Sequence, residues 1–482
     1  MSAWSAPSIL GIDTMRCILL SLIALLAITL HAQAGDKRKP NIIYILADDL
    51  GYAELGSYGQ DKIRTPRLDM MAKQGLRFTQ HYSGNAVCAP SRCVLMTGLH
   101  SGHAQVRNNS ETKPDGQLPI VANTLTIARI LQQLGYATGM IGKWGLGMHD
   151  STGDPQKQGF GHFFGYYCQR HAHNHCPKFL WRNAQQVPLE GNPGGAKGKT
   201  HSHDLFEKES LEFIRKNKDK SFFLYLPFTI PHVALQSNDE SLKEYQGKFE
   251  ETPYLGKKGY QPHPTPRAAY AAMITQMDRT VGRIIDLLQQ LGLDDDTIII
   301  FSSDNGPTHD GVGGSDSVFF RSAGRLRGFK GSLFEGGVRV PMIVRWPGES
   351  APGRTTEHIS GFQDVLPTLC DIAGAKTPNG LDGISMLPTI LGKGAQKEHD
   401  FLYWEFPGYG GQQAVRMGDW KALRQNMHKG NLTLQLYNLA KDIGETTDVA
   451  AANPAIVERA LRIMHEQHVP SKVFPFKAID GK

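Results

Sequence analysis

Two kinds of hydrophobic pattern divide this chain into elements. Uninterrupted apolar runs are typical of strands buried on both faces, and three occur, at residues 41–47, 222–227 and 297–303. Amphipathic stretches predict helices at 65–75, 124–134, 266–290 and 362–373. Shorter apolar runs predict further strands at 137–141 and 342–345. The β-α-β order predicts an α/β fold with a large, mostly parallel mixed sheet between helices.

The pattern changes after residue 394. Short strand-like runs separated by turn residues predict a small antiparallel sheet, at 401–404, 413–416, 421–424 and 434–437. An amphipathic helix is expected over 454–467. We therefore predict an α/β domain over 36–394 and a C-terminal subdomain over 395–482.

Residues 150–205 do not follow either pattern. They are rich in Gly, Pro, His and aromatic residues, and we predict a long irregular insertion that lines a pocket, because loops of this length are usually functional or disordered.

The first 34 residues have the composition of a signal peptide. Met15 and Arg16 precede an apolar run over 17–30, and Ala-Gln-Ala at 32–34 forms a small-x-small cleavage site. Translation from Met15 would give the usual order of these features. The prediction is a secreted or periplasmic protein with no stable membrane insertion after cleavage, and the alternative is an uncleaved anchor.

Composition narrows the class of protein only slightly. The chain has 482 residues, 40% hydrophobic and 20% charged, which indicates a large folded core. A formal net charge of +6 is mild for this length and does not indicate nucleic acid as a partner. Six cysteines are too few for a disulfide scaffold, and Cys168 with Cys176 is the local candidate for one bridge.

Polar pairs end two of the buried strands. Asp48 and Asp49 follow the first apolar run, and Asp304 and Asn305 follow the third. Sites in open α/β sheets form beyond the carboxyl ends of strands. Four oxygen donors suit a hard cation, Ca²⁺ or Mg²⁺, better than Zn²⁺.

A short motif gives these pairs a context. Residues 88–92 read Cys-Ala-Pro-Ser-Arg and residues 95–98 read Leu-Met-Thr-Gly. The stretch resembles the signature of the type I, formylglycine-dependent sulfatases, which are arylsulfatase-like members of the alkaline phosphatase superfamily. Further motifs follow in the order expected of that family, at 142–144 (Gly-Lys-Trp), 231–232 (Pro-His), 304–306 (Asp-Asn-Gly) and 328–339.

The resemblance implies an alkaline-phosphatase-like fold and a sulfuric ester hydrolase. It implies that a formylglycine-generating enzyme transiently binds the chain and converts Cys88 to 3-oxoalanine (formylglycine). The hydrated aldehyde would attack sulfur and form a sulfo-enzyme intermediate, which its second hydroxyl resolves. A helix that begins near Ser91 would place backbone N–H groups beside the sulfate.

The resemblance also implies the roles of individual residues. It implies one Ca²⁺ ion, with Mg²⁺ less favoured, held by Asp48, Asp49, Cys88, Asp304 and Asn305. Arg92 and Lys143 would hold the diol and the sulfate. His232 and Lys330 would flank the ester oxygen and assist the leaving alcohol, while Asp304 would also take the proton of the diol.

One position departs from the family pattern. Gly145 stands where the family usually has His after Lys-Trp, a residue thought to help the sulfated intermediate collapse. Our hypothesis is that another imidazole takes this place, and the candidates are His149, His171, His173 and His175. All four could also contact substrate.

Three functions are compatible with these residues. The first is a secreted sulfatase that acts on a sulfated carbohydrate rather than a simple aryl sulfate. The second is a phosphonate monoester or phosphodiester hydrolase with the same nucleophile, because the two transition states share a geometry. The third is a binding protein for sulfated glycans that has lost turnover.

Overall fold

The computed structural model describes residues 1–4, 38–257 and 259–481. Apart from its first four residues, the predicted signal peptide lies outside this part of the chain. The chain divides into two units, Met1–Lys39 and Pro40–Lys482, and the account below concerns the second. Within the described ranges, no helix combines the length and the hydropathy that a membrane span requires.

Buried parallel strands form the centre of the main sheet. β1 (Asn41–Asp48) lies between β10 (Thr297–Ser303) and β9 (Phe222–Pro231), and both pairings are parallel. All three strands are completely buried. On the far side of β9, β5 (Ala137–Lys143) continues the parallel arrangement. The three apolar runs are therefore the buried strands that the sequence predicted.

The flanks of the sheet are mixed. Beyond β10 come β11 (Arg339–Arg345) and β2 (Leu76–Tyr82), both antiparallel to their inner neighbour, followed by β12 (Arg354–Thr356) and β13 (Ser360–Gly361). Strand β2 was not predicted from the sequence, because its alternation of polar and apolar residues is weak.

The insertion over 150–205 is more regular than predicted. It contributes β6 (His162–Tyr166), β7 (Phe179–Arg182) and β8 (Gln185–Pro188), which extend the main sheet beyond β5. The expectation of a wholly irregular insertion was wrong, since backbone pairing with β5 orders residues whose composition favours loops. Between β6 and β7 lies the short helix η2 (His171–His173).

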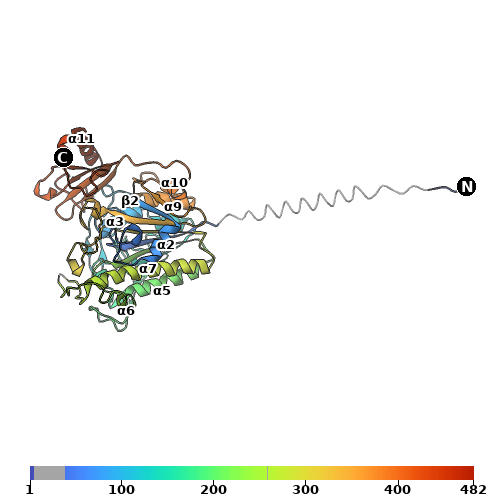
Figure 1. The fold of residues 1–482 in the computed structure, drawn as a ribbon. Coiled ribbons are helices and arrows are strands. Elements are labelled where there is room, and N and C mark those ends of the chain that lie inside the picture. The colour runs from blue at the N-terminus through green and yellow to red at the C-terminus, as the bar shows by residue number, and fades with distance from the viewer. Residues whose placement is uncertain (5–37, 258, 482) are drawn as a thin grey trace. The chain divides into compact units, whose positions relative to one another are not determined.

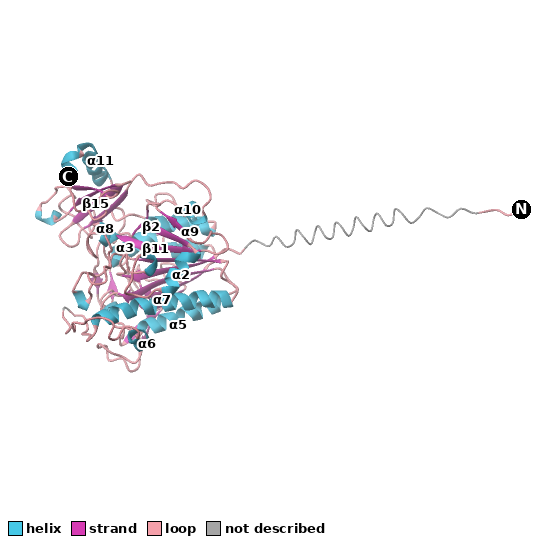
Figure 2. Ribbon diagram, in the orientation of Figure 1, coloured by secondary structure: helices cyan, strands magenta, loops and turns pink. Residues whose placement is uncertain are grey.

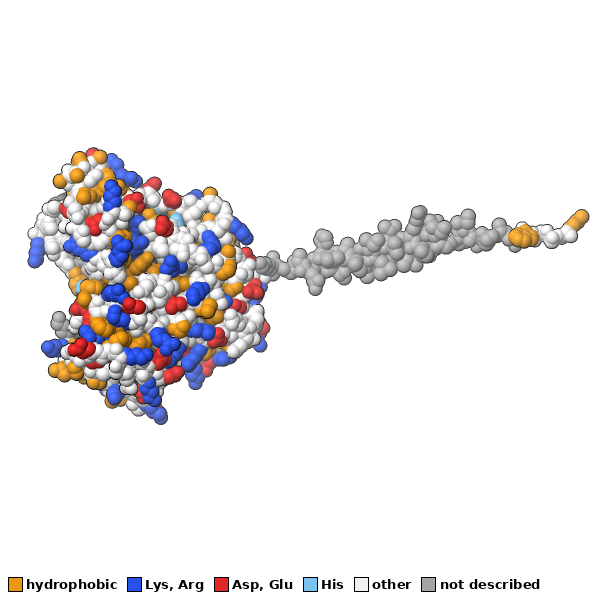
Figure 3. Space-filling view, in the orientation of Figure 1, with side chains coloured by type: hydrophobic (Ala, Val, Ile, Leu, Met, Phe, Trp, Pro, Cys, Tyr) orange, Lys and Arg blue, Asp and Glu red, His pale blue; other side chains and the backbone are white. Residues whose placement is uncertain are grey.

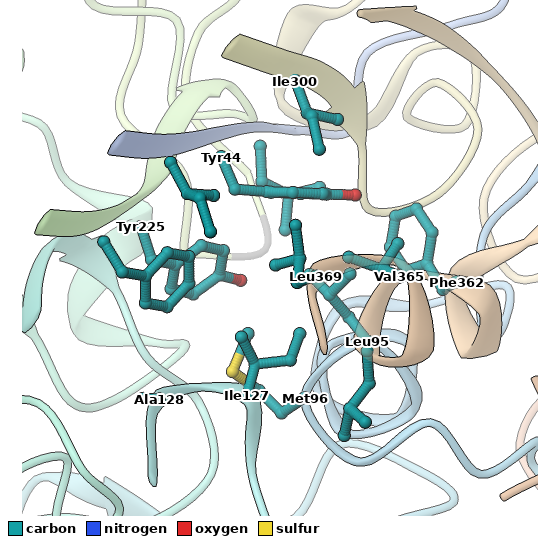
Figure 4. Close-up of a cluster of buried hydrophobic side chains, with 14 of the residues drawn as sticks. Tyr44, Leu95, Met96, Ile127, Ala128, Tyr225, Ile300, Phe362, Val365 and Leu369 are labelled. Atoms are coloured by element: carbon teal, nitrogen blue, oxygen red, sulfur yellow. The ribbon is translucent and has the colours of Figure 1, made fainter. Parts of the chain in front are cut away.

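Helices cover both faces of the sheet (Figures 1 and 2). Side chains of β1 alternate between the two faces. Tyr44 and Leu46 pack with α3 (Cys88–Thr97), α4 (Ile127–Gln133) and α9 (Val365–Ala373), as Figure 4 shows for Tyr44. Ile43 and Ile45 pack with α2 (Pro66–Gln74), α5 (Ser202–Asn217) and α7 (Pro266–Gln290). The shorter elements are β3 (Glu111–Thr112), β4 (Gly116–Gln117), α6 (Asp239–Lys243), α8 (Glu335–Val338) and α10 (Leu387–Leu391).

The C-terminal segment forms the predicted antiparallel sheet. Its order is β14 (Leu402–Phe406), β15 (Gln412–Met417), β16 (Trp420–Arg424) and β17 (Gln435–Asn438). Helix α11 (Pro454–Glu466) packs on one face of this sheet. Residues from the chain before position 395, among them Tyr82 and Phe334, pack on the other face. The subdomain boundary at 394 stays a prediction. On the visible surface, Lys and Arg are interspersed with Asp and Glu (Figure 3).

Candidate active site

The parallel pairing of β1 and β10 brings the two polar pairs together. Ala47 lies opposite Ser303, so both strands end at the same level. The backbone N–H of Asp49 donates to Oδ1 of Asp304 (3.1 Å), and Nδ2 of Asn305 donates to Oδ1 of Asp49 (2.8 Å). All these polar side chains are buried. The predicted convergence of four oxygen-bearing residues is therefore present.

Cys88 is the first residue of helix α3, three positions earlier than the predicted start near Ser91. Its Sγ lies 3.4 Å from Oδ1 of Asp48 and 3.5 Å from Nζ of both Lys143 and Lys330. The sulfur is thus in direct contact with one carboxylate and two ammonium groups, although the side chain is 1% exposed.

Three cations from separate elements balance three carboxylates. Arg92, one turn further along α3, donates from Nε (3.1 Å) and Nη2 (2.8 Å) to Oδ2 of Asp304. Lys143, at the end of β5, donates to Oδ2 of Asp48 (2.6 Å), and Lys330 donates to Oδ2 of Asp49 (2.8 Å). The cluster therefore presents positive charge on several sides of Cys88.

His232 follows β9 and completes the cluster. Its Nε2 lies 3.6 Å from Oδ2 of Asp49, and its Nδ1 donates to the carbonyl of Val233. Burial, together with Lys330, lowers the pKa of His232 to about 4. The imidazole is therefore neutral near pH 7, with Nε2 on the side of Asp49.

Burial and charge shift the pKa values of the carboxyl and thiol groups. Burial disfavours the ionised form of Asp48, but the charges of Lys143 and Arg92 outweigh it and lower the pKa of Asp48 well below its usual value. Burial raises the pKa of the Cys88 thiol to about 12. An unmodified Cys88 is consequently a protonated thiol near neutral pH, and a protonated thiol is a weak nucleophile.

The cluster fits a hard divalent cation. Asp48, Asp49, Cys88 and His232 each offer a ligand atom, and these atoms all lie within 4.8 Å of one another. The Oδ1 atom of Asn305 is buried and has no hydrogen-bond partner among the described residues. An orphaned carbonyl oxygen beside carboxylates is the donor chemistry that Ca²⁺ and Mg²⁺ prefer.

Two of the four candidate histidines contact this cluster, and both do so through His232. The ring of His173 stacks on His232, with centroids 4.7 Å apart. His175 is buried and bonds to Thr229 and to the carbonyl of His232. His171 forms a hydrogen bond with Asp115. His149 forms a hydrogen bond with Asp150, and its ring packs against Trp181. These partners all lie outside the cluster.

Several residues at the site were not predicted from the sequence. Thr308 donates to Oδ2 of Asp49 (2.7 Å) and lies just three residues after Asn305, a spacing that could have pointed to it. Tyr260 stacks near His173, with centroids 5.2 Å apart. Tyr409 lies beside Gly331, and Gln169 lies beside Gly145. Nothing local in the sequence indicates the position of either residue.

The suggested disulfide is absent. Cys168 and Cys176 are free buried thiols, as are the other three cysteines that the structure describes. The Sγ of Cys168 accepts a bond from Gln117, whereas Cys176 lies beyond the η2 turn, near Gly198. Proximity in sequence did not bring the two thiols into a bond.

Fold and site together define a sulfuric ester hydrolase of the alkaline phosphatase superfamily. The family model described as Sulfatase matches residues 40–375, so the chain belongs to the sulfatase family. A second model, N-sulphoglucosamine sulphohydrolase, C-terminal, matches residues 329–467. The chain is a type I sulfatase, an enzyme that hydrolyses sulfate esters.

Individual relatives agree with the family assignment. Arylsulfatase A of Homo sapiens is 32% identical, over 92% of this chain and 89% of its own length. N-acetylgalactosamine-6-sulfatase of Mus musculus is 30% identical, over 84% and 74%. Among solved structures, Ps i-CgsB in complex with k-i-k-neocarrahexaose has a TM-score of 0.74 at 30% identity, covering 89% of this chain and 92% of that chain.

Proposed function

We propose that this sulfatase is a secreted or periplasmic enzyme that removes sulfate from a sulfated carbohydrate, with Cys88 converted to formylglycine. The observation that carries the proposal is the position of Cys88 at the start of α3, in contact with Asp48, Lys143 and Lys330. The high pKa of the thiol supports it, because an unmodified side chain at this place is a weak nucleophile.

The modified residue and the metal would each supply one element of the chemistry. A hydrated formylglycine at position 88 would supply one hydroxyl as the nucleophile and a second hydroxyl for release of the sulfate. Asp48, Asp49, Asp304, Asn305 and residue 88 would hold a Ca²⁺ ion, which would supply Lewis-acid stabilisation of sulfate oxygens.

The remaining steps belong to the charged side chains around residue 88. Lys143 and Arg92 hold the anionic sulfate, because Lys143 contacts the position of the nucleophile and Arg92 pairs with Asp48 and Asp304 next to it. Lys330 and His232 border it on the side of Asp49, where the leaving alcohol needs a hydrogen-bond donor; the ammonium of Lys330 is that donor, and His232 flanks the ester oxygen and can donate only when Nε2 is protonated. Asp304, fixed by two bonds from Arg92, is the acceptor for the proton of the nucleophile.

An aromatic wall beside Lys330 supports a carbohydrate substrate. Tyr409 is 64% exposed, and its ring lies 2.6 Å from the position that a Cβ on Gly331 would take. His173 and Tyr260 continue the wall next to His232. Rings of this kind stack against sugars, and the relatives include an enzyme named for a sulfated amino sugar and a structure that contains a neocarrahexaose.

Mass spectrometry of the peptide that contains Cys88 tests the nucleophile. Conversion of the thiol to an aldehyde lowers the mass by about 18 Da. A Cys88→Ala variant should lose hydrolysis of nitrophenyl sulfate and of sulfated oligosaccharides. An unmodified thiol in a fully active enzyme would overturn the proposed nucleophile.

Rates on different esters test the substrate class. We expect nitrophenyl sulfate to be hydrolysed faster than nitrophenyl phosphate diesters, and desulfation of a sulfated oligosaccharide to be faster still. Preference for phosphonate or phosphate diesters would support the related hydrolase, and glycan binding without sulfate release would support a binding protein. For localisation, N-terminal sequencing of the exported protein should begin at Gly35.

A further inference from the structure

We propose that Gln169 is a substrate-binding residue of this enzyme. Its side-chain amide donates a hydrogen bond to the sulfated end of the substrate, beside Gly145, where the family has an imidazole. The inference rests on the proposed function, because it assigns a further contact to the same site.

The first observation is an unsatisfied amide. Gln169 is 5% exposed, and neither Nε2 nor Oε1 has a hydrogen-bond partner among the described residues. Buried polar side-chain atoms in native proteins are nearly always paired, so an amide with both ends unpaired needs an explanation. A ligand that enters the site and pairs with the amide is one such explanation.

The second observation is where this amide lies. Nε2 of Gln169 is 2.0 Å from the position that a Cβ on Gly145 would occupy. The backbone N–H groups of Trp144 and Gly145 donate to the carbonyls of Tyr166 (2.9 Å) and Tyr167 (3.2 Å), so the chain just after β5 stays bonded to the end of β6. The amide therefore fills the space that a larger residue at position 145 would take.

This space lies two residues beyond the catalytic Lys143, the last residue of β5. Gly145 has a φ of +87°, so the chain leaves the extended conformation there, and a larger residue at this position would be strained as well as blocked by the amide. The intervening Trp144 donates from Nε1 to the carbonyl of Gly153 (2.7 Å). Lys143 in turn reaches Cys88 at 3.5 Å.

The segment that carries Gln169 also borders the site at its other end. The η2 turn follows Gln169 and ends at His173, whose ring stacks on His232. His173 therefore borders the cluster, and Gln169 lies two residues before the same η2 turn. The imidazole of His173 lies against His232, while the place beside Gly145 is taken by the amide.

An amide and an imidazole serve a substrate differently. Glutamine offers two N–H donors and one acceptor and carries no charge at any working pH. It can bind a sulfate oxygen or an adjacent sugar hydroxyl, but it cannot transfer a proton. Its removal should therefore weaken binding without changing the pH dependence of the rate.

The test compares Gln169→Ala and Gln169→Glu with Gln105→Ala as a matched control. Gln105 is a partly buried glutamine whose amide bonds to Pro119 and Val121, outside the site. For Gln169→Ala we expect KM for a sulfate ester to rise about tenfold or more. For the isosteric Gln169→Glu it should rise further, because a carboxylate repels sulfate. The pH profile of kcat should stay unchanged.

Two readouts separate substrate binding from a structural role. Because the amide bonds to no described residue, Gln169→Ala removes packing but no hydrogen bond, and its melting temperature should fall no further than that of Gln105→Ala. Calorimetry of inorganic sulfate binding to Cys88→Ala protein, with and without Gln169→Ala, measures the contact without turnover. An unchanged KM and sulfate affinity, or a loss that parallels a lower melting temperature, would overturn the inference.

The same calorimetry distinguishes the two proposals. If the parent enzyme hydrolyses no sulfate ester but Cys88→Ala protein binds sulfate through Gln169, the proposed function fails and this contact stands. If the parent enzyme is an active sulfatase and Gln169→Ala behaves like Gln105→Ala, only this inference fails.

Discussion

A buried lysine links the C-terminal sheet to the segment around Glu335, which follows the catalytic Lys330. Nζ of Lys421, on β16, lies 2.8 Å from Oε1 of Glu335 and 3.2 Å from Oε1 of Glu445, and all three side chains are fully buried. Glu335 begins α8, five positions after Lys330. We predict that Lys421→Met destabilises the enzyme and lowers its activity by loosening the segment that carries Lys330.

The contacts around Lys421 give the size of the expected loss of stability. Without Lys421, Glu335 keeps the hydroxyl of Tyr82 (2.6 Å) and Arg339 (3.2 Å), whereas Glu445 keeps only the backbone N–H of Glu335 (2.7 Å). An uncompensated buried charge costs about 3–5 kcal/mol. At roughly 2.1 cal/mol/K per residue over about 440 residues, this corresponds to a fall of about 3–5 °C in the midpoint.

Differential scanning calorimetry measures the effect, with Lys441→Met, an exposed lysine of the same segment, as control. Burial raises the pKa of Glu445 to about 7, so its protonation should make the penalty smaller at pH 6 than at pH 8. Adding Glu445→Gln should restore part of the loss. A midpoint within 1 °C of the parent for Lys421→Met, or no recovery in the double variant, would refute the reasoning.

Three further predictions follow from the site and the core. Burial lowers the pKa of His81 to about 3, below its unfolded value of about 6.5, so the unfolded chain binds the proton first. The free energy of unfolding should therefore fall between about pH 6.5 and pH 3, by up to about 1.4 kcal/mol per pH unit. His81→Gln should flatten this slope in urea unfolding at different pH values, and an unchanged slope would contradict the prediction. Removal of the metal by a chelator should abolish activity and lower the melting midpoint. Adding Ca²⁺ at 100 times its Kd should restore about 2.7 kcal/mol of the free energy of unfolding. A melting midpoint that does not change with Ca²⁺ would argue against the metal site. His232→Gln should lower kcat about 10²–10⁴-fold with little change in KM, and parental turnover would remove His232 from the mechanism.

Local patterns in the sequence predicted the buried framework of this enzyme. The apolar runs at β1 and β10 could only be strands buried on both faces, and α7 has the predicted bounds, 266–290. The polar pairs at the two strand ends predicted a convergent site because parallel neighbours end at one edge. These inferences succeed because burial on two faces leaves a continuous signal within a few residues.

Contacts between distant segments decided the rest. The weakly patterned residues of β2 and of the 150–205 insertion become strands because β11 and β5 offer them open edges to pair with. The space beside Gly145 is filled from position 169, on the far side of a strand and a loop. Backbone pairing and the filling of a vacant volume depend on neighbours in space, and no local pattern of hydrophobicity records them.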